Sequence, residues 1–413
     1  MREVVHFGTV VLVVAGGFTI ALAAAKLTEF VPIPAPAVFL VAAAVASDIY
    51  PHLGTYLAVR DVERLAVVAL VVILFAGGFD IGRRRFRLAA VPIVSLGVLG
   101  TFATAGIVAV FAHWALGLGW ITAGLLGSAV APTDPAVMFS VLGGREIAGR
   151  TGTILKGESG ANDPVGIALM IGMIALATHP GSSFWIVGRE FGIEMGVGLA
   201  IGLAGGLVES WLLRAIEFEN TGLHTVRTLA AAGVVYGAAS AAHGSGFLAV
   251  FVAGLIVGDA QAPFKHEIEI FQSALSNVAE IVVFVALGVT VTLGEIPGGR
   301  WGEGIVLALF LALVARPLAV GALLLPVRLR PGERAFVAWG GLKGAVPILL
   351  AAFALLAGVR DGQRIYDLVF IVVLFSVIVQ GASIPLAAAR LGVPMRRVRA
   401  GQEQEPWERT ESA

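Results

Sequence analysis

The sequence predicts an all-α polytopic membrane protein. Of its 413 residues, 58% are hydrophobic and only 14% are charged, and the mean hydropathy is +0.91. A soluble domain of this size needs far more charge on its surface. The 53 glycines often occur with alanine and serine, small residues that let helices in a bilayer approach closely. The chain is therefore expected to contact the lipid bilayer, and its zero net charge gives no indication of nucleic-acid binding.

About thirteen membrane-spanning helices of roughly 17–30 residues are predicted from hydropathy and from the spacing of Gly and Pro. The first is long enough to span and has no basic segment before it, so we interpret it as a helix rather than a cleavable signal peptide. The predicted spans are residues 4–25, 33–48, 62–80, 88–112, 120–142, 150–177, 184–213, 223–242, 246–259, 276–293, 302–326, 333–357 and 366–389.

Two segments are predicted not to cross the membrane. Pro263 to Ser276 mixes charged and apolar side chains, which is typical of an amphipathic segment at the membrane interface. Residues 1–389 are expected to form the membrane domain. Residues 390–413 are expected to form a short, disordered cytoplasmic tail.

Basic residues follow the odd-numbered spans three, five, eleven and thirteen, and the opposite loops are poorer in them. Because cytoplasmic loops carry an excess of Lys and Arg, this pattern places the N-terminus outside and the C-terminus in the cytoplasm. We therefore predict a multi-pass protein of the cell (inner) membrane with this orientation. The basic residues are Arg83, Arg84, Arg85, Arg87, Arg145, Arg150, Arg328, Arg330, Arg334, Arg390, Arg396, Arg397 and Arg399.

Thirteen spans divide into two groups of six joined by a linker, so spans five and twelve correspond in an inverted repeat. Span five carries Thr133-Asp134-Pro135 and span twelve carries Lys343-Gly-Ala-Val-Pro347, both at mid-depth. A charge beside a helix breaker at corresponding positions of two halves points to a transporter site. We therefore predict that spans five and twelve are broken helices that cross.

Five ionisable residues are predicted near the membrane centre: Asp134, Glu158, Asp163, Arg316 and Lys343. Each costs ~2.5–3.5 kcal/mol or more if it faces lipid, so these residues must face one another or water. Three acids and two bases leave one negative charge, which one proton or one monovalent cation neutralises. The count predicts an electroneutral antiporter that exchanges one monovalent cation for one proton.

Asp163 is the predicted carrier, which binds proton and cation alternately. Pro164 removes a backbone donor beside it, so the alternative is that Asp163 caps a broken half-helix. Asp134 has two interpretations of equal weight, as a cation ligand or as compensation for half-helix N-termini.

The other buried polar residues have predicted supporting roles. Glu158 and Arg316 are interpreted as a structural ion pair that joins spans six and eleven. Lys343 is expected to balance half-helix C-termini rather than bind substrate. Thr133, Ser159 and Asn162 offer oxygen ligands for a monovalent cation, although Ser159 equally suits a packing role. The histidines show no metal-ligand spacing, so no transition-metal site and no cofactor is predicted.

These motifs resemble those of the monovalent cation/proton antiporter superfamily, in its NhaP-type or sodium/proton exchanger branch. The resemblance implies that residues like Asp134 and Asp163 contribute to the ion site and that Glu158 pairs with Arg316. It also implies a homodimer, in which a six-helix core moves against a dimerisation layer. The motifs are Thr133-Asp134-Pro135, Glu158-Ser159, Asn162-Asp163, Ala315-Arg316-Pro317-Leu-Ala-Val320 and Gly340-Gly-Leu-Lys-Gly-Ala-Val-Pro347.

The chain departs from this family pattern at several points. Lys343 stands where arginine is usual. Ala76 replaces an acid found in many relatives, so that ligand is lost or moved to Asp80. The segment Gly160-Ala-Asn-Asp-Pro164 resembles members linked to potassium as well as sodium, which leaves a K⁺-selective antiporter as the alternative. No folded regulatory domain is expected after span thirteen.

Two functions of other classes were weighed against exchange. An intramembrane aspartyl protease also needs two aspartates on neighbouring spans, but it needs a shared-proton pair without the adjacent bases predicted here. An ion channel more often repeats a filter around a symmetry axis. The chain is therefore predicted to be an electroneutral secondary antiporter that exchanges Na⁺ or K⁺ for H⁺, and not an enzyme.

Overall fold

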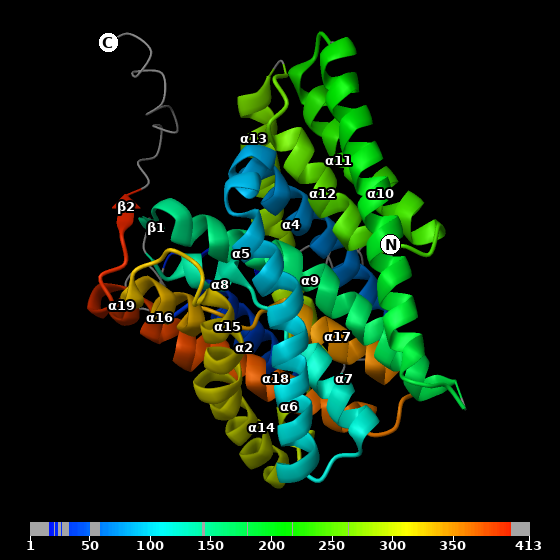
Figure 1. Cartoon of the computed structure of the whole chain (residues 1–413), viewed down its shortest axis with the longest axis vertical. Helices are drawn as coiled ribbons and strands as arrows, with labels where there is room; N and C mark the ends of the chain where they lie inside the picture. Colours follow the sequence, from blue (N-terminus) through cyan, green and yellow to red (C-terminus); the bar gives the residue numbers. More distant parts are fainter. Residues whose placement is uncertain are drawn as a thin grey trace, which may run out of the picture.

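The computed structural model describes residues 16–19, 21–23, 26, 33–49, 58–142, 145–179, 181–216, 218–262 and 264–397. Over these residues the chain is mostly helical (Figure 1). Seven helices are long and apolar enough to cross a membrane, and four shorter apolar helices lie among them. The all-α membrane fold is confirmed. The count of thirteen spans stays a prediction, because most of the span at 4–25 lies outside the described residues.

The first half of the chain contains α2 (Ala35–Ile49), α4 (Val59–Leu88), α5 (Ala90–Val94), η1 (Ser95–Gly100), α6 (Thr101–Ala115), α7 (Trp120–Val130), α8 (Pro135–Ser140), strand β1 (Arg145–Ile147) and α9 (Gly149–Thr178). The π-helical η1 joins α5 to α6 within one long span. Helix α4 has a kink at Gly82, whose φ is 68°. Arg83 to Arg87 therefore follow the kink, close to the predicted end of span three.

The rest of the chain contains α10 (Trp185–Ala215), α11 (Thr221–Ala241), α12 (Gly246–Gly258), α13 (Lys265–Val289), η2 (Leu293–Glu295), α14 (Gly298–Phe310), η3 (Leu311–Ala315), α15 (Arg316–Leu324), α16 (Pro331–Trp339), α17 (Ala345–Leu356), α18 (Gly362–Phe375), η4 (Ser376–Gln380), α19 (Gly381–Arg390) and strand β2 (Met395–Arg397). Segments η1 and η3 are both π-helical and lie in spans four and eleven, which correspond in the two halves. Such segments are frequent at functional sites.

The two predicted helix breaks are confirmed. Span five is interrupted between α7 and α8, and span twelve between α16 and α17. Pro135 is the first residue of α8 and Pro347 lies in the first turn of α17. A proline at the start of a helix loses no intrahelical hydrogen bond, because the first N–H groups have no helical acceptor. Each proline thus starts a new half-helix within the bundle.

Two predictions about segment boundaries are wrong. Helix α13 is continuous from Lys265 to Val289, so Pro263 to Ser276 does not form a separate interfacial segment over its described residues. The tail predicted to be disordered contains β2, which pairs antiparallel with β1 in the register Arg145 to Arg397. Backbone hydrogen bonds to a segment some 250 residues away order these residues, and hydropathy carries no signal for that pairing. Residues 398–413 lie outside the described part of the chain.

Helices α4 and α12 pack closely against each other. A Cβ atom on Gly254 would lie 2.4 Å from the Phe75 carbonyl oxygen, and one on Gly258 would lie 2.2 Å from that of Phe79. Glycine is required at both positions because the two backbones touch there. Helix α13 packs against α4 and α2 on the same side of the bundle.

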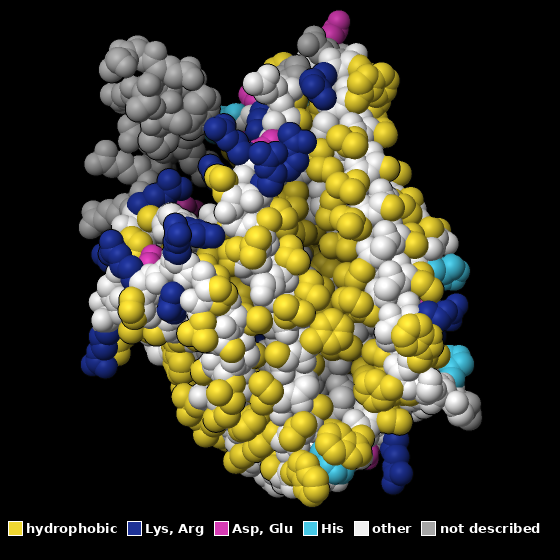
Figure 2. Space-filling model, viewed as in Figure 1, with side chains coloured by type: hydrophobic (Ala, Val, Ile, Leu, Met, Phe, Trp, Pro, Cys, Tyr) yellow, Lys and Arg dark blue, Asp and Glu magenta, His cyan; other side chains and the backbone are white. Residues whose placement is uncertain are grey.

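The basic segments gather at one end of the molecule. The strand pair β1–β2 brings the segments after spans five and thirteen together, and Thr151 at the start of α9 binds Glu333 at the start of α16. Figure 2 shows Lys and Arg concentrated towards the upper left of the view, while most of the remaining surface is hydrophobic. Such a surface suits a bilayer bounded by a basic interface.

Candidate functional site

The two helix breaks meet in the middle of the bundle. The backbone N–H of Asp134, in the first break, donates to the Leu342 carbonyl in the second, at 2.8 Å. A Cβ atom on Gly344 would lie 2.0 Å from a carboxylate oxygen of Asp134. Position 344 therefore admits only glycine, and Asp134 lies directly against the start of α17. The crossing of broken helices predicted from two distant motifs is present.

Each charge at the crossing lies at a helix end of opposite sign. Asp134 is the N-cap of α8 and accepts a hydrogen bond from the Ala136 N–H at 2.8 Å. The ammonium group of Lys343 donates to the carbonyls of Ala131 and Pro132, both at 2.9 Å, immediately after α7. An anion at a helix N-terminus and a cation at a C-terminus are both stabilised by the peptide dipoles. The geometry at both residues is that of dipole compensation.

Helix α9 holds the first break through Thr133. The Ser159 hydroxyl donates to the Thr133 carbonyl at 2.6 Å, and the Asn162 amide donates to the Thr133 hydroxyl at 2.8 Å. All three side chains are buried. The oxygens of Thr133 and Ser159 keep lone pairs for a cation, whereas Asn162 already uses its amide to fix the break.

Among the carboxylates at the crossing, Asp163 is the one with a buried oxygen left unsatisfied in the described structure. It is 6% exposed, and its Oδ1 atom is buried without a hydrogen-bond partner in the described structure. Helix α9 continues through Pro164 to Thr178, so the alternative that Asp163 caps a broken half-helix is wrong. A buried carboxylate without donors is costly when ionised, unless a proton or a cation neutralises it.

Glu158 and Arg316 form a buried, bidentate ion pair. The guanidinium of Arg316 donates to both carboxylate oxygens, at 2.8 and 3.1 Å, and the two side chains are 2% and 4% exposed. Arg316 also donates to the Val337 carbonyl at 3.3 Å. This pair links α9 to α15 and to the end of α16, just before the second break.

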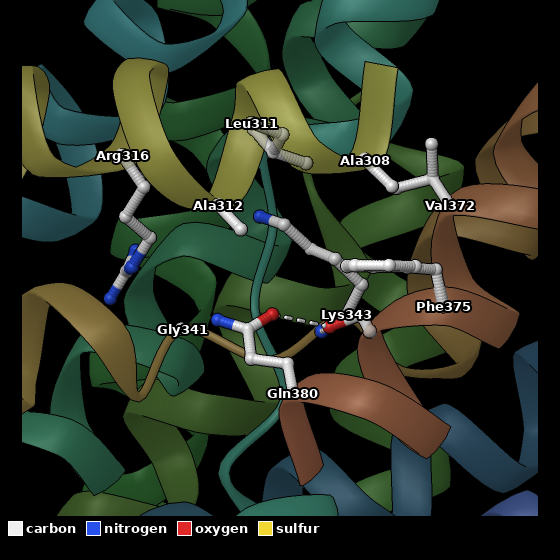
Figure 3. A pocket seen from close by; sticks show the side chains of 10 residues that line it. Ala308, Leu311, Ala312, Arg316, Gly341, Lys343, Val372, Phe375 and Gln380 are labelled. Atoms are coloured by element: carbon white, nitrogen blue, oxygen red, sulfur yellow. Dashed lines mark hydrogen bonds between the residues drawn. The ribbon is translucent and has the colours of Figure 1, made fainter. Parts of the chain in front are cut away.

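Residues that the sequence analysis did not identify hold the second break. The Ser376 hydroxyl accepts from the Lys343 backbone N–H and donates to Gln380, both at 2.9 Å. Gln380 in turn donates to the Trp339 carbonyl at 2.6 Å. Figure 3 shows Lys343, Arg316 and Gln380 around a cavity of about 10 Å³, which is about enough for one water molecule. The sequence contains a signal for these two residues, because Ser376 and Gln380 are a polar pair in an apolar span. They resemble Ser159 and Asn162 in span six.

Asp80 and Lys156 lie away from the crossing. Their side chains pair at 2.7 Å, and both are partly exposed, at 57% and 31%. Lys156 also lies 3.8 Å from Glu146, beside the strand pair. Asp80 therefore does not replace the acid that is missing at Ala76. Among the residues that the structure describes, no group of three His, Cys, Asp or Glu side chains could hold a metal ion.

The chain matches a family model described as "Sodium/hydrogen exchanger, transmembrane" over residues 17–390. It is 34% identical to the K(+)/H(+) antiporter NhaP2 of Shewanella sp. (strain ANA-3), over 83% of this chain and 61% of that protein. It is 32% identical to the K(+)/H(+) antiporter NhaP of Alkalimonas amylolytica, over 93% of this chain and 67% of that protein. The chain thus spans about three fifths of the length of the NhaP2 protein.

The fold is also similar to a solved structure. The sodium proton antiporter MjNhaP1 from Methanocaldococcus jannaschii superposes with a TM-score of 0.78 at 21% sequence identity. The similarity covers 95% of this chain and 99% of that one. At this level of identity the likeness concerns the arrangement of the helices.

Proposed function

Since the chain belongs to the transmembrane sodium/hydrogen exchanger family, we propose that it exchanges Na⁺ or K⁺ for H⁺ across the cell membrane. The exchange is electroneutral, with one cation moved for each proton. The family is one of transporters, so the protease hypothesis gains no support from the two aspartates. No resident cofactor takes part in this mechanism.

The buried, unpartnered oxygen of Asp163 is the observation that carries the proposal. Glu158 forms an ion pair with Arg316, and Asp134 accepts a hydrogen bond from the N-terminus of α8. Asp163 has no comparable donor among the described residues. A proton or a monovalent cation removes the cost of its charge equally well. Since only one of them can occupy the carboxylate at a time, Asp163 binds them alternately, and that competition couples their transport.

The remaining residues of the crossing have assigned roles in this proposal. Oxygen ligands suit hard cations, so Thr133 and Ser159 complete the shell around a cation at Asp163. Asn162 positions Thr133 through its hydrogen bond. Asp134 adds negative charge beside the site while it caps α8, and Lys343 balances the end of α7.

The names of the relatives point to different transported cations. The two curated relatives are named K(+)/H(+) antiporters, and the solved neighbour is named a sodium proton antiporter. We propose that the site accepts both ions, with selective K⁺ exchange as the alternative.

We also propose an N-terminus outside, a C-terminus in the cytoplasm and a homodimer in the membrane. The orientation rests on the basic end of the molecule. The dimer rests on an exposed apolar row on α10, formed by Leu199, Leu203, Leu207 and Trp211 at four-residue spacing. Cross-linking between cysteines introduced along this row, in native membranes, tests the assembly.

Transport in proteoliposomes tests the function. Vesicles with a pH-sensitive dye inside are exposed to Li⁺, Na⁺ or K⁺ at constant ionic strength, with choline as the balancing cation. We expect Na⁺ or K⁺ to change the internal pH, and no change in vesicles without protein. Absence of a cation-dependent pH change for all three ions would refute the proposed exchange.

A further inference from the structure

A carboxylate that the five-residue charge count omitted lies halfway along α13. Glu280 follows Lys265, the first residue of the helix, by fifteen positions, or roughly 22 Å at a rise of 1.5 Å per residue. The start of α13 lies at the basic end, since Lys265 binds the Gly258 carbonyl and neighbouring Asp259 accepts from the Arg84 N–H. At the other end, Thr290 binds Tyr366. Glu280 therefore lies at the depth of the membrane interior.

Glu280 has no ion-pair or hydrogen-bond partner for its side chain among the described residues, although that side chain is half-buried. Three other acids in the spans form ion pairs: Glu158 with Arg316, Glu303 with Arg364, and Asp367 with Arg300. A bare carboxylate at mid-depth is costly against lipid and is retained where it faces water or an ion. The partial exposure of Glu280 is consistent with a hydrated site.

Helix α13 packs against α17, and the residue before α17, Gly344, touches the Asp134 carboxylate. Helix α13, which carries Glu280, thus lies beside the helix that begins at the crossing. A carboxylate on this helix adds to the negative charge that attracts monovalent cations towards the crossing.

A line of polar side chains leads along α13 from the basic end to Glu280. Gln272, Ser276 and Glu280 follow one another at four-residue intervals, which places them on one face of the helix. Gln272 is 2% exposed, and both polar atoms of its amide lack partners in the described structure. Unsatisfied buried amides are rare in native proteins, and bound water or an ion satisfies such groups.

We propose that Glu280 is a further cation-binding residue, at the inner end of a polar path along α13 that leads monovalent cations to Asp134 and Asp163. This inference rests on the proposed exchange activity. Glu280 belongs to the side of the bundle formed with α2 and α4, so it concentrates the cation next to the site without carrying it. Its loss should therefore weaken apparent cation affinity more than maximal rate.

The substitution Glu280→Gln removes the charge and keeps the shape of the side chain. In proteoliposomes, we expect the KM for Na⁺ or K⁺ to rise by about tenfold, the low end of electrostatic concentration effects, while the maximal rate changes little. Glu280→Asp should restore most of the affinity. Glu267→Gln, on the exposed first turn of the same helix, is the matched control and should leave both parameters unchanged.

Two results would overturn the proposal: an unchanged KM in Glu280→Gln, or a lower maximal rate at unchanged KM, which a purely structural role predicts. A second measurement does not need transport. The Tm of the purified protein in detergent is followed against NaCl or KCl, with choline chloride as the balance. The cation concentration needed for a given rise in Tm should be about tenfold higher in Glu280→Gln, and an equal concentration in both proteins would contradict the role. Absence of exchange by the unchanged protein would instead count against the proposed function.

Discussion

At the scale of single residues, the buried carboxylates differ in what neutralises them. Glu158 receives two hydrogen bonds from Arg316, and Asp134 receives one from the N-terminus of α8. Asp163 keeps a buried oxygen without any donor among the described residues. Because an unpaired buried charge is more costly than a paired one, we expect Asp163 to be the residue whose occupancy changes during transport.

Replacing Asp163 with Asn should abolish exchange and leave the protein folded. The amide has nearly the same shape but neither releases a proton nor neutralises a cation. Cation-dependent pH change in proteoliposomes should fall to the level of empty vesicles, while size-exclusion profile and Tm stay close to those of the unchanged protein. Asp80→Asn, at the exposed pair with Lys156, is the control and should retain exchange. Near-normal flux in the Asp163 variant would remove the carrier role.

Glu158 and Arg316 should be energetically coupled. Replacing either one with Ala leaves its partner buried and unpaired, at a cost of roughly 3–5 kcal/mol. Each single variant should therefore lose thermal stability in detergent, and the double variant should lose less than the sum. Strictly additive losses of Tm would mean that the pair does not form in the membrane protein as purified.

At the scale of elements, the site depends on the contact between two helix breaks. The backbone bond from Asp134 to Leu342 ties the breaks together. Each break is then fixed by a neighbouring helix, the first by Ser159 and Asn162 on α9, and the second by side chains of η4. Backbone groups that lose their helical hydrogen bonds inside a membrane are tolerated only where other protein groups bind them. The breaks are therefore rigid parts of the site.

Gly344→Ala tests this contact. The added methyl group would overlap the Asp134 carboxylate, and overpacking of this kind costs roughly 1–3 kcal/mol. We expect a lower Tm and a loss of exchange of about tenfold or more, since the shift displaces Asp134. Gly321→Ala is the matched control, because no atom lies within 4 Å of the position that its added methyl group would take; it should keep both activity and Tm. Equal behaviour of the two variants would argue against the crossing geometry.

At the scale of the whole molecule, the charges of the crossing sum to one negative charge. The pair of Glu158 and Arg316 is neutral, and Lys343 offsets one of the two aspartates. Lys156 lies outside the count, because it pairs with Asp80 near the basic end. Glu280 is on α13, outside the group of helices that carries the crossing. One bound proton or one monovalent cation therefore makes the crossing neutral.

Exchange should consequently be independent of membrane potential. An unbalanced charge would feel ~2.3 kcal/mol per 100 mV, whereas a neutral loaded site feels none. Rates and end points of Na⁺ exchange in proteoliposomes should stay the same when valinomycin and a K⁺ gradient impose a potential. Vesicles without protein measure the passive ion leak, which is subtracted from the measured exchange rates. A steady-state transport current on a solid-supported membrane would contradict electroneutral exchange.

Much of this could be predicted from the sequence, because it depends on local properties of the chain. Long apolar runs predict spans, and Pro135 and Pro347 predict where two of them break. Charges inside apolar runs identify Asp134, Asp163 and Lys343 as residues of the crossing, since lipid does not tolerate them. The pairing of Glu158 with Arg316 was predicted as well, whereas the two carbonyls that accept from Lys343 were not.

Only the tertiary structure decided which groups meet. Nothing local to Lys343 indicates that its ammonium group binds the carbonyls after α7, or that Ser376 binds its backbone. The tail strand β2 is ordered by β1, and α13, which carries Glu280, lies beside α17 only in the folded bundle. Hydrogen bonds and charge pairs join residues far apart in sequence. Their formation depends on how the helices pack, whereas hydropathy and helix breaking act within a few residues.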